Sequence, residues 1–386
     1  MSAFEEVFGK KHKYVFSAPG RTEIGGNHTD HQHGRVLAGA VDLYARAYAS
    51  ENGENAIRLV SRGYAPVAVD ISDLAPREDE KNTTAALLRG VAAGVKDAGA
   101  SISGLDIYVC SDVPQGSGLS SSACFEVLLA QVFNDLFCGG ALSPVMIAQI
   151  GKRAENIYFG KPSGLMDQAA CASGGVCFMD FKDENAPEIA RVSFDFEKAG
   201  LSLCIINAGA SHEDLTGEYA AVPREMGEIA AFFGKTVLRE VAGRDFYAGI
   251  PALRKACGDR AVLRAMHLFA EDERAALEYR ALLDNDIKTF LRLVRASGES
   301  SQTLLQNITP AGAAREQSVA LCLALCEKEL SGEGACRVHG GGFAGTVQAF
   351  VPRDMLKTFK KGIEAVFGAA SCRALSISEQ GAVREK

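Results

Sequence analysis

The sequence lacks any run of about 18 apolar residues, the length that a membrane-spanning helix requires. Residues 1–13 are polar and charged, without the apolar segment of a secretion signal. The chain also lacks a basic excess, because 48 acidic residues outnumber 41 basic ones, and a nucleic-acid surface needs a basic face. We therefore expect a cytoplasmic protein that binds neither membrane nor nucleic acid and acts on small molecules.

Paired cysteines are also missing. The 11 cysteines are scattered, mostly within apolar segments where a free thiol behaves as a small apolar side chain. Cys322 and Cys326 are four residues apart on an expected helix but have no second ligand pair, so they do not predict a metal site. The chain does have 386 residues, 47% of them hydrophobic, which is enough for two domains with separate cores.

Extended and helical segments alternate along the chain, which indicates an α/β or α+β architecture. Extended segments are expected at residues 13–17, 36–50, 57–60, 107–113, 176–181, 192–196, 201–206 and 346–351. Helices are expected after the capping residues Thr83 and Thr84, after Ser120 to Ser122, from Ser143-Pro144 to Gly160, and across residues 215–330. We place a domain boundary near residue 200.

Residues 113–123, Val-Pro-Gln-Gly-Ser-Gly-Leu-Ser-Ser-Ser-Ala, join an extended segment to an amphipathic helix. Gly116 and Gly118 let the backbone approach a ligand closely, and the free N–H groups of the helix start attract an anion. A Walker A loop is excluded, because no lysine follows the last glycine. The segment predicts a different phosphate-binding loop, although by itself it also fits an ordinary strand-to-helix corner.

Three further segments concentrate glycine and polar side chains. They are Ala18-Pro-Gly-Arg-Thr-Glu-Ile-Gly-Gly-Asn-His-Thr-Asp-His31, Lys161-Pro-Ser-Gly-Leu-Met-Asp-Gln168 and Arg337-Val-His-Gly-Gly-Gly-Phe-Ala-Gly345. Each has an ordinary structural reading: a solvated turn, a capping aspartate and a tight glycine corner, respectively. The functional reading is that each contributes to a ligand site, as polar loops often do.

Together and in this order, the four segments resemble the motifs of the GHMP kinases, and most closely those of the galactokinases. Gly20-Arg21 with Gly26-Asn-His-Thr-Asp30 resembles the sugar signature Gly-Arg followed by Gly-Glu-His-Thr-Asp. The loop at 113–123 resembles Pro-x-x-x-Gly-Leu-x-Ser-Ser-Ala, residues 163–168 resemble Gly-Ile-Met-Asp-Gln, and residues 337–345 resemble Arg-x-x-Gly-Gly-Gly-Phe-Gly-Gly. The resemblance extends over nearly the whole chain.

The resemblance implies an α+β, two-domain GHMP kinase fold with the active site in the cleft between the domains. Residues 1–200 would form a ribosomal-protein-like domain with a left-handed βαβ unit, which carries the sugar signature and the ATP loop. Residues 201–386 would form a ferredoxin-like domain. The implied activity is transfer of a phosphoryl group from ATP, with Mg²⁺, to the C1 hydroxyl of D-galactose. An oligomeric partner is not indicated.

The resemblance also assigns roles to residues. Asp167 would be the catalytic base, and Arg21 would keep it ionised and stabilise the moving phosphoryl group. The sugar would be bound by Asn27, His28, Asp30, Gly164 and Tyr219. ATP would be bound by Gly116, Ser117, Gly118, Leu119, Ser120, Ser121, Ser122 and Ala123. The metal would be held by Ser121, Ser122 and Glu155, since Mg²⁺ prefers oxygen ligands.

Some residues depart from the family pattern. Asn27 replaces the glutamate expected to bind the C6 hydroxyl, and Thr22-Glu23 replaces Val-Asn. The chain also has no tryptophan, which many relatives place near the nucleotide. Because an amide carries no charge, galacturonate or L-arabinose becomes an alternative substrate.

The class of protein is also open to two competing interpretations. One is a non-catalytic sensor of galactose and ATP, which the intact serine run and the presence of Asp167 disfavour. The second is a homoserine or mevalonate kinase, which the sugar signature and Glu218-Tyr219 disfavour. Asn207 and His212 fall at family spacing, whereas the histidines His31, His33 and His339 have no matched role.

Overall fold

The computed structural model describes residues 2–209, 215–343 and 345–385. The strands are β1 (Tyr14–Gly25), β2 (Arg35–Glu51), β3 (Ala56–Ser61), β4 (Val67–Asp70), β5 (Leu105–Ser111), β6 (Val176–Asp180), β7 (Glu188–Val192), β8 (Leu201–Asn207), β9 (Ala335–His339), β10 (Thr346–Pro352), β11 (Cys372–Leu375) and β12 (Val383–Arg384). The helices are α1 (Ala3–Phe8), α2 (Thr84–Asp97), α3 (Ser121–Cys138), α4 (Pro144–Arg153), α5 (Met166–Ser173), α6 (Thr216–Phe232), α7 (Gly243–Ala256), α8 (Asp259–Leu283), α9 (Ile287–Ser300), α10 (Ser318–Leu330) and α11 (Leu356–Phe367).

In the described part of the chain, β1 to β7 and β12 form an eight-stranded sheet. Its main order is β12-β1-β2-β5-β3-β4, and β6 pairs with β2 on one side and with β7 on the other. The register between β1 and β2 shifts between Pro19 and Gly20 and again between Glu23 and Gly25. Such irregularities re-aim side chains, so the bulges bracket the residues of β1 that carry the sugar signature.

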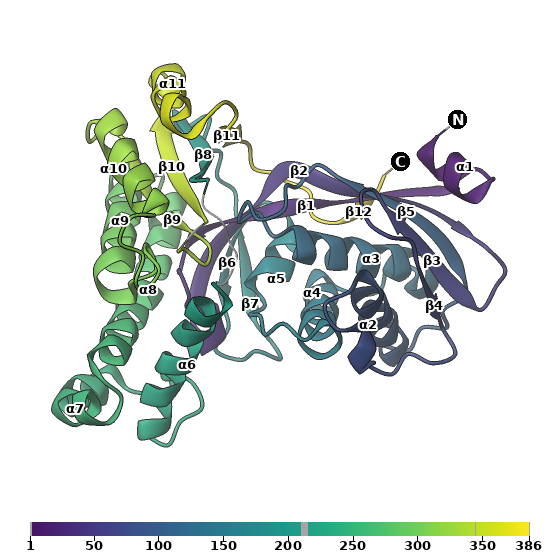
Figure 1. The fold of residues 1–386 in the computed structure, drawn as a ribbon, viewed down its shortest axis with the longest axis horizontal. Coiled ribbons are helices and arrows are strands. Elements are labelled where there is room, and N and C mark those ends of the chain that lie inside the picture. Colours follow the sequence, from purple (N-terminus) through teal and green to yellow (C-terminus); the bar gives the residue numbers. More distant parts are fainter. Residues whose placement is uncertain (1, 210–214, 344, 386) are drawn as a thin grey trace.

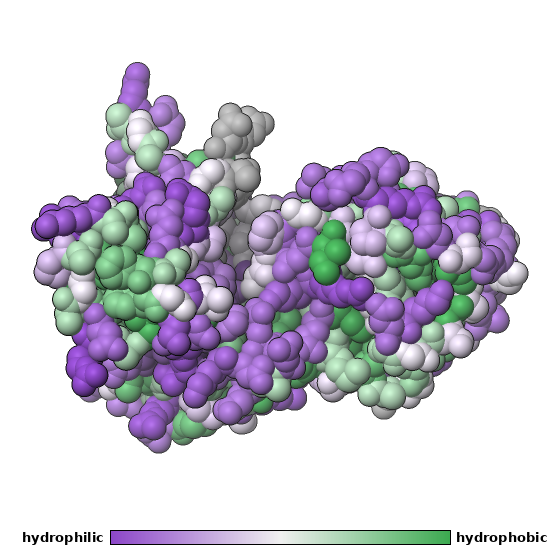
Figure 2. Space-filling model, turned by 90° about the horizontal axis from the view of Figure 1, so that it is seen from below, coloured by the Kyte–Doolittle hydropathy of each residue, from purple (hydrophilic) through white to green (hydrophobic). Residues whose placement is uncertain are grey.

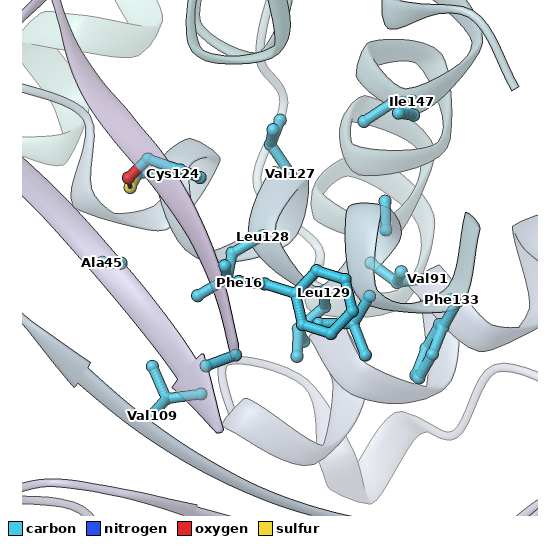
Figure 3. Packing of buried hydrophobic residues seen from close by; sticks show 14 of the residues in the cluster. Phe16, Ala45, Val91, Val109, Cys124, Val127, Leu128, Leu129, Phe133 and Ile147 are labelled. Carbon is cyan, nitrogen blue, oxygen red and sulfur yellow. Dashed lines mark hydrogen bonds between the residues drawn. The ribbon is translucent and has the colours of Figure 1, made fainter. Parts of the chain in front are cut away.

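Helices α2 to α5 lie together against one face of this sheet (Figure 1). The apolar face of α3 supplies Leu128, Leu129 and Val132, all fully buried, as the periodicity predicts. They belong to one apolar cluster with Phe16 of β1, which is also fully buried, and Figure 3 shows Leu128 and Leu129 beside Phe16. Thr83 caps α2 by accepting a hydrogen bond from the Ala86 backbone N–H, which confirms the predicted helix start.

A smaller antiparallel sheet has the order β11-β8-β10-β9. Helices α10 and α11 cover one of its faces, while α9 packs on the other with Phe290 against Phe350. The helix-rich section predicted across 215–330 is confirmed as α6 to α10. Strand β12 leaves this half of the molecule and pairs with β1 of the larger sheet.

Two sequence expectations differ from the structure. Strand β7 ends at Val192, whereas we expected a strand at 192–196. Phe194 and Phe196 are buried alternately, but the Phe194 N–H bonds to the carbonyl of Val192, so the backbone turns away from the sheet. The glycine corner predicted after Arg337 is preceded by a buried strand, β9, which the sequence pattern did not predict.

The predicted domain boundary near residue 200 stays a prediction, although the change from one sheet to the other falls between β7 and β8. No helix in the described ranges is both long enough and apolar enough to cross a membrane. Figure 2 shows a face covered mostly by hydrophilic residues, with apolar residues in smaller patches between them.

Candidate active site

A cavity of about 520 Å³ lies where the two sheets meet. Its walls come from β1, from the loop before α3, from the segment before α5, from α6, and from the turn between β9 and β10. All four sequence motifs therefore line one cavity. The predicted residues that reach it are Arg21, His28, Asp30, Gly116, Gly118, Gly164, Asp167 and Tyr219.

Asp167 lies in the first turn of α5 and faces two donors. Arg21 Nε lies 2.8 Å and Nη2 2.7 Å from its Oδ1, and Ser120 Oγ donates to its Oδ2. Arg21 also donates to the carbonyl of Gly118 in the phosphate-loop candidate. One guanidinium therefore ties together the carboxylate and the loop.

The charges around Asp167 keep it ionised. Burial opposes ionisation, but the charge of Arg21 and the hydrogen bonds from Ser120 and Arg21 outweigh it, so the pKa of Asp167 lies below its ordinary value. Burial likewise opposes the charge on Arg21, whereas Asp167 and Glu23 favour it, and the pKa of Arg21 is raised. The pair is therefore a carboxylate and a guanidinium at neutral pH.

The loop before α3 has the backbone of an anion site. Gly116 and Gly118 have φ angles of 64° and 70°, in the left-handed region that glycine adopts readily. Ser120, the N-cap residue, has a φ of 54° and makes no side-chain cap bond, because its hydroxyl is directed to Asp167. The first N–H groups of α3 thus lack a side-chain acceptor at the N-cap, the state that attracts phosphate oxygens.

Other residues of the loop lie away from the cavity wall. Leu119 is 2% exposed and belongs to the core of the larger sheet, and Ala123 is also buried. Ser117 Oγ donates to the carbonyl of Pro114. Any contact of Leu119 and Ala123 with a nucleotide would therefore use their backbone rather than their side chains.

Glu155 lies in a π-helical segment, residues 154–159, that continues α4. Its Oε1 lies 3.2 Å from Ser122 Oγ and 2.8 Å from Lys161 Nζ, and its Oε2 accepts from Gln168 Nε2 at 3.0 Å. The contact with Ser122 joins two of the three predicted metal ligands, whereas the described residues show no hydrogen bond between Ser121 and Glu155. The Lys161 ammonium group contacts the Glu155 carboxylate, so the surroundings of Glu155 favour a cation.

The predicted sugar residues converge on the opposite wall. His28 Nε2 donates to the carbonyl of Gly341 at 3.2 Å, and the Tyr219 hydroxyl donates to the carbonyl of Gly342 at 3.1 Å. A Cβ atom on Gly164 would lie 1.8 Å from Asp30 Oδ2, so only glycine fits beside that carboxylate. Tyr219 lines the cavity, which favours the functional reading of this residue over a purely core one.

Asp30 differs from Asp167 in charge state. Burial, together with the negative charges of Asp167 and Glu23, raises the pKa of Asp30 to about 7. Burial also lowers the pKa of His28, which favours its neutral form. The sugar side of the cavity therefore contains groups that both donate and accept hydrogen bonds near neutral pH.

Asn27 requires a correction, because the structure places it behind the cavity wall. Its side chain is fully buried and all its hydrogen-bonding capacity is used within the protein. Nδ2 donates to Glu23 Oε1 at 2.9 Å and to the carbonyl of Gly340 at 2.7 Å, while Oδ1 accepts from Ser301 and Asn307. The Asn27 amide therefore has no hydrogen-bonding group left for a ligand in the cavity.

Four titratable residues that line the cavity were not assigned from the sequence: Glu23, His31, Lys161 and His339. His339 Nε2 accepts from the Glu23 backbone N–H at 3.2 Å, so the ring proton is on Nδ1, which donates to Thr346 Oγ1 at 3.0 Å. A Cβ on Gly118 would lie 2.7 Å from that Nδ1, so the phosphate-loop candidate packs directly on this ring. Lys161 and His339 lie within two of the four sequence segments, and this position in the sequence could have indicated that they line the cavity.

Other residues at family spacing lie elsewhere. Asn207 is exposed and accepts from the Gly209 N–H, and Glu218 accepts from the Ala311 N–H. His33, which has no matched role in the family pattern, pairs with Glu184 at 3.7 Å, outside the cavity wall. His212 falls outside the described residues.

Comparisons with known proteins agree with this geometry. A model of the GHMP kinases N terminal domain matches residues 85–175, and a galactokinase galactose-binding signature matches residues 2–51. A galactokinase from Streptomyces coelicolor is 33% identical over 97% of this chain and 94% of its own, and one from Enterococcus faecalis is 31% identical over 95% and 92%.

Solved structures show the same fold. The crystal structure of Lactococcus lactis galactokinase complexed with galactose superposes with a TM-score of 0.83 at 23% identity, covering 98% of this chain and 97% of that one. A mevalonate kinase structure gives a TM-score of 0.67 at 15% identity, over 95% and 100% of the two chains. The α+β, two-domain GHMP kinase fold is thereby confirmed. With four motifs on one cavity and relatives matched over nearly its full length, the chain belongs to the galactokinase family of the GHMP kinases.

Proposed function

We propose that the protein transfers the γ-phosphoryl group of ATP to the C1 hydroxyl of D-galactose. The observation that carries this proposal is the ionised Asp167, held by Arg21 and Ser120 where the phosphate-loop candidate meets the cavity. A sugar hydroxyl is a poor nucleophile at neutral pH, so a carboxylate that takes its proton is the group the reaction needs.

Asp167 has the capacity for this step. A carboxylate offers about four acceptor positions, and Arg21 and Ser120 use only part of them. The substrate hydroxyl would donate to a remaining position, lose its proton to Asp167 and bond to the γ-phosphorus, while ADP leaves. Arg21 would stabilise the charge on the transferring group, because it already contacts both Asp167 and the loop at Gly118.

Nucleotide phosphates would lie against Gly116, Gly118 and the first N–H groups of α3, helped by the charge of Lys161. Mg²⁺ fits the pair Ser122 and Glu155, which brings a hydroxyl and a carboxylate oxygen within 3.2 Å of each other. When bound, Mg²⁺ would neutralise phosphate charge. Ser121 remains a second hydroxyl at the start of the same helix.

Galactose is the sugar that the cavity favours. Three carboxyl groups, those of Glu23, Asp30 and Asp167, line it and suit a ligand rich in hydroxyl donors. Galacturonate would bring a further negative charge to this wall, which like charges oppose. His28, Gly164 and Tyr219 would complete the sugar contacts.

An assay of ADP release with D-galactose, galacturonate and L-arabinose, with and without Mg²⁺, tests the proposal. We expect turnover on D-galactose to exceed that on both other sugars, to require Mg²⁺, and to yield a 1-phosphate identified by phosphorus NMR. A higher kcat/KM on galacturonate or L-arabinose than on D-galactose would identify that sugar as the preferred substrate. Binding of ATP and galactose without turnover would identify a sensor instead.

A further inference from the structure

Glu23 and Asn27 exchange the two side-chain types of the galactokinase pattern. The pattern has an amide at position 23 and a carboxylate at position 27, whereas this chain has the carboxylate first and the amide second. The two side chains touch, since Asn27 Nδ2 lies 2.9 Å from Glu23 Oε1. One carboxylate and one amide are thus retained in contact, but the negative charge has moved along the chain.

The exchange changes which residue faces the cavity. Glu23 lines it, whereas Asn27 does not. The amide of Asn27 also has a single sensible orientation, because the flipped amide would set its oxygen against the Glu23 carboxylate and the Gly340 carbonyl. Asn27 therefore holds Glu23 and has no remaining hydrogen-bonding group for a ligand.

The Glu23 carboxylate is fixed from several sides. Arg337 Nη2 donates to its Oε1, and Arg337 is held in turn by the carbonyl of Ile24 at 2.7 Å. The backbone N–H of Glu23 donates to His339 and its carbonyl accepts from Gln348 at 2.8 Å. The Glu23 side chain is only 4% exposed, so its position is set before any ligand arrives.

Only one of the two carboxylate oxygens is used. Oε1 accepts from Asn27 and Arg337, while Oε2 receives no hydrogen bond from the described residues. Oε2 is not among the fully buried polar atoms of the described residues that lack a partner, so it remains accessible from the cavity that Glu23 lines. The free oxygen belongs to a residue of the cavity wall, where a ligand hydroxyl can supply the missing donor.

We propose that Glu23 is a substrate-contacting, specificity-determining residue whose Oε2 accepts a hydrogen bond from a hydroxyl of the bound sugar. Asn27 and Arg337 are positioning residues that orient this carboxylate. The inference rests on the proposed sugar-kinase function and deepens it. It also means that a neutral residue at position 27 does not open the site to galacturonate, because the charge persists at position 23.

Glu23→Gln tests the contact with almost no change in shape. Asn27 and Arg337 both donate to this side chain, so the new amide would turn its oxygen toward them and its NH₂ toward the cavity. The cavity would then meet a donor in place of an acceptor. We expect the galactose Kd, measured by calorimetry without ATP, to rise about 10- to 100-fold, as expected for a lost hydrogen bond to a charged group.

A set of monodeoxygalactoses identifies the hydroxyl. The wild-type protein should bind one of them markedly more weakly than galactose, and Glu23→Gln should abolish that preference while leaving the KM for Mg·ATP within about twofold. Glu278→Gln is the matched control, because Glu278 is fully buried near Arg337 without lining the cavity. Burial raises the pKa of Glu278 well above its ordinary value, so an amide replaces a neutral acid there.

The reciprocal variant guards against misfolding. Glu23→Asn alone should weaken galactose binding. Adding Asn27→Glu returns the carboxylate to the family position, so the double variant should bind galactose at least tenfold more tightly than Glu23→Asn. Unchanged galactose affinity and unchanged deoxysugar preference in Glu23→Gln would overturn the inference while leaving the kinase proposal intact. Absence of wild-type turnover on galactose would overturn the kinase proposal, and the calorimetric comparison would still decide the role of Glu23.

Discussion

The two ends of the cavity, the proposed reacting end around Asp167 and the proposed sugar end around Glu23, are built differently. At the reacting end, Asp167 is about one-third exposed, and both its partner Arg21 and Gly118, to which Arg21 also donates, match the family motifs. At the sugar end, Glu23 and Arg337 are almost completely enclosed, and the departures from the motif occur there as a pair. A change in an enclosed charged network needs a compensating change, because it otherwise leaves a buried charge unmatched.

The comparison predicts the largest effect at the reacting end. Asp167→Asn should reduce kcat by about 10²- to 10⁴-fold, the usual contribution of a positioned base, with little change in the Kd of galactose or ATP. Stopped assays for kcat and calorimetry for binding measure the two quantities separately. If kcat in Asp167→Asn remains near that of the wild type, Asp167 has no part in proton transfer.

The second-largest effect is expected at Glu155, a proposed metal ligand. Glu155→Ala removes the carboxylate that contacts Ser122 and Lys161, so the Mg²⁺ concentration for half-maximal rate should rise at least about tenfold. The galactose Kd should not change. The exposed Glu188→Ala serves as control, and an unaltered Mg²⁺ dependence in Glu155→Ala would remove this residue from the metal site.

At the sugar end, a substitution should change the stability of the fold. Asn27→Asp sets a second carboxylate against Glu23 Oε1, replacing a donor with an acceptor. We expect the free energy of unfolding to fall by about 1–3 kcal/mol, the cost of an unsatisfied buried polar group. Urea unfolding measures it, and a matching loss in Asp167→Asn would contradict the distinction between the two ends.

A smaller, pH-dependent effect is expected at Asp30. Its pKa is about 7 in the folded protein, against an ordinary value of 3.8, so the folded state keeps a proton that the unfolded chain releases between about pH 4 and pH 7. The stability contributed by Asp30 is therefore lost as pH rises through this window. Thermal melts should show the Tm of Asp30→Asn gaining on wild type from pH 5 to pH 8.

The exposed Asp284→Asn is the control for that experiment and should track the wild type. Saturating galactose should alter the Asp30 difference, because the proposed sugar contact changes the surroundings of the carboxyl group. A Tm difference that stays constant across the pH range would show that Asp30 keeps an ordinary pKa.

The reacting end could largely be predicted from the sequence, because its residues lie in motifs that can each be recognised separately, although the contact of Arg21 with Asp167 joins distant parts of the chain. Gly116, Gly118 and the serines lie on one strand-to-helix connection, and these neighbouring residues alone predict a phosphate-binding loop. The sugar end depends on contacts between residues far apart in the chain, such as Glu23 with Arg337 and Asn27 with Asn307. Spacing along the sequence does not reveal such pairs, so the sequence assigns Asn27 to the cavity and leaves Glu23, which lines it, unassigned.

Secondary structure shows the same division. Capping by Thr83 is local and was predicted, whereas the end of β7 at Val192 depends on which strand lies beside it. Alternating burial of Phe194 and Phe196 imitates a strand, although their backbone turns out of the sheet. Periodicity reports which side chains are buried, but pairing partners decide what the backbone does.

The pairing of β12 with β1 joins Val383 to Ser17 and Arg384 to Phe16. During translation, β1 leaves the ribosome long before its neighbour exists, so the larger sheet gains its full set of strands only after residue 384 has been made. The half of the molecule that is synthesised first is thus completed last. The edge of β1 that pairs with β12 therefore has no partner strand through most of the synthesis of the chain. Such an unpaired edge is where pairing with a wrong strand would begin.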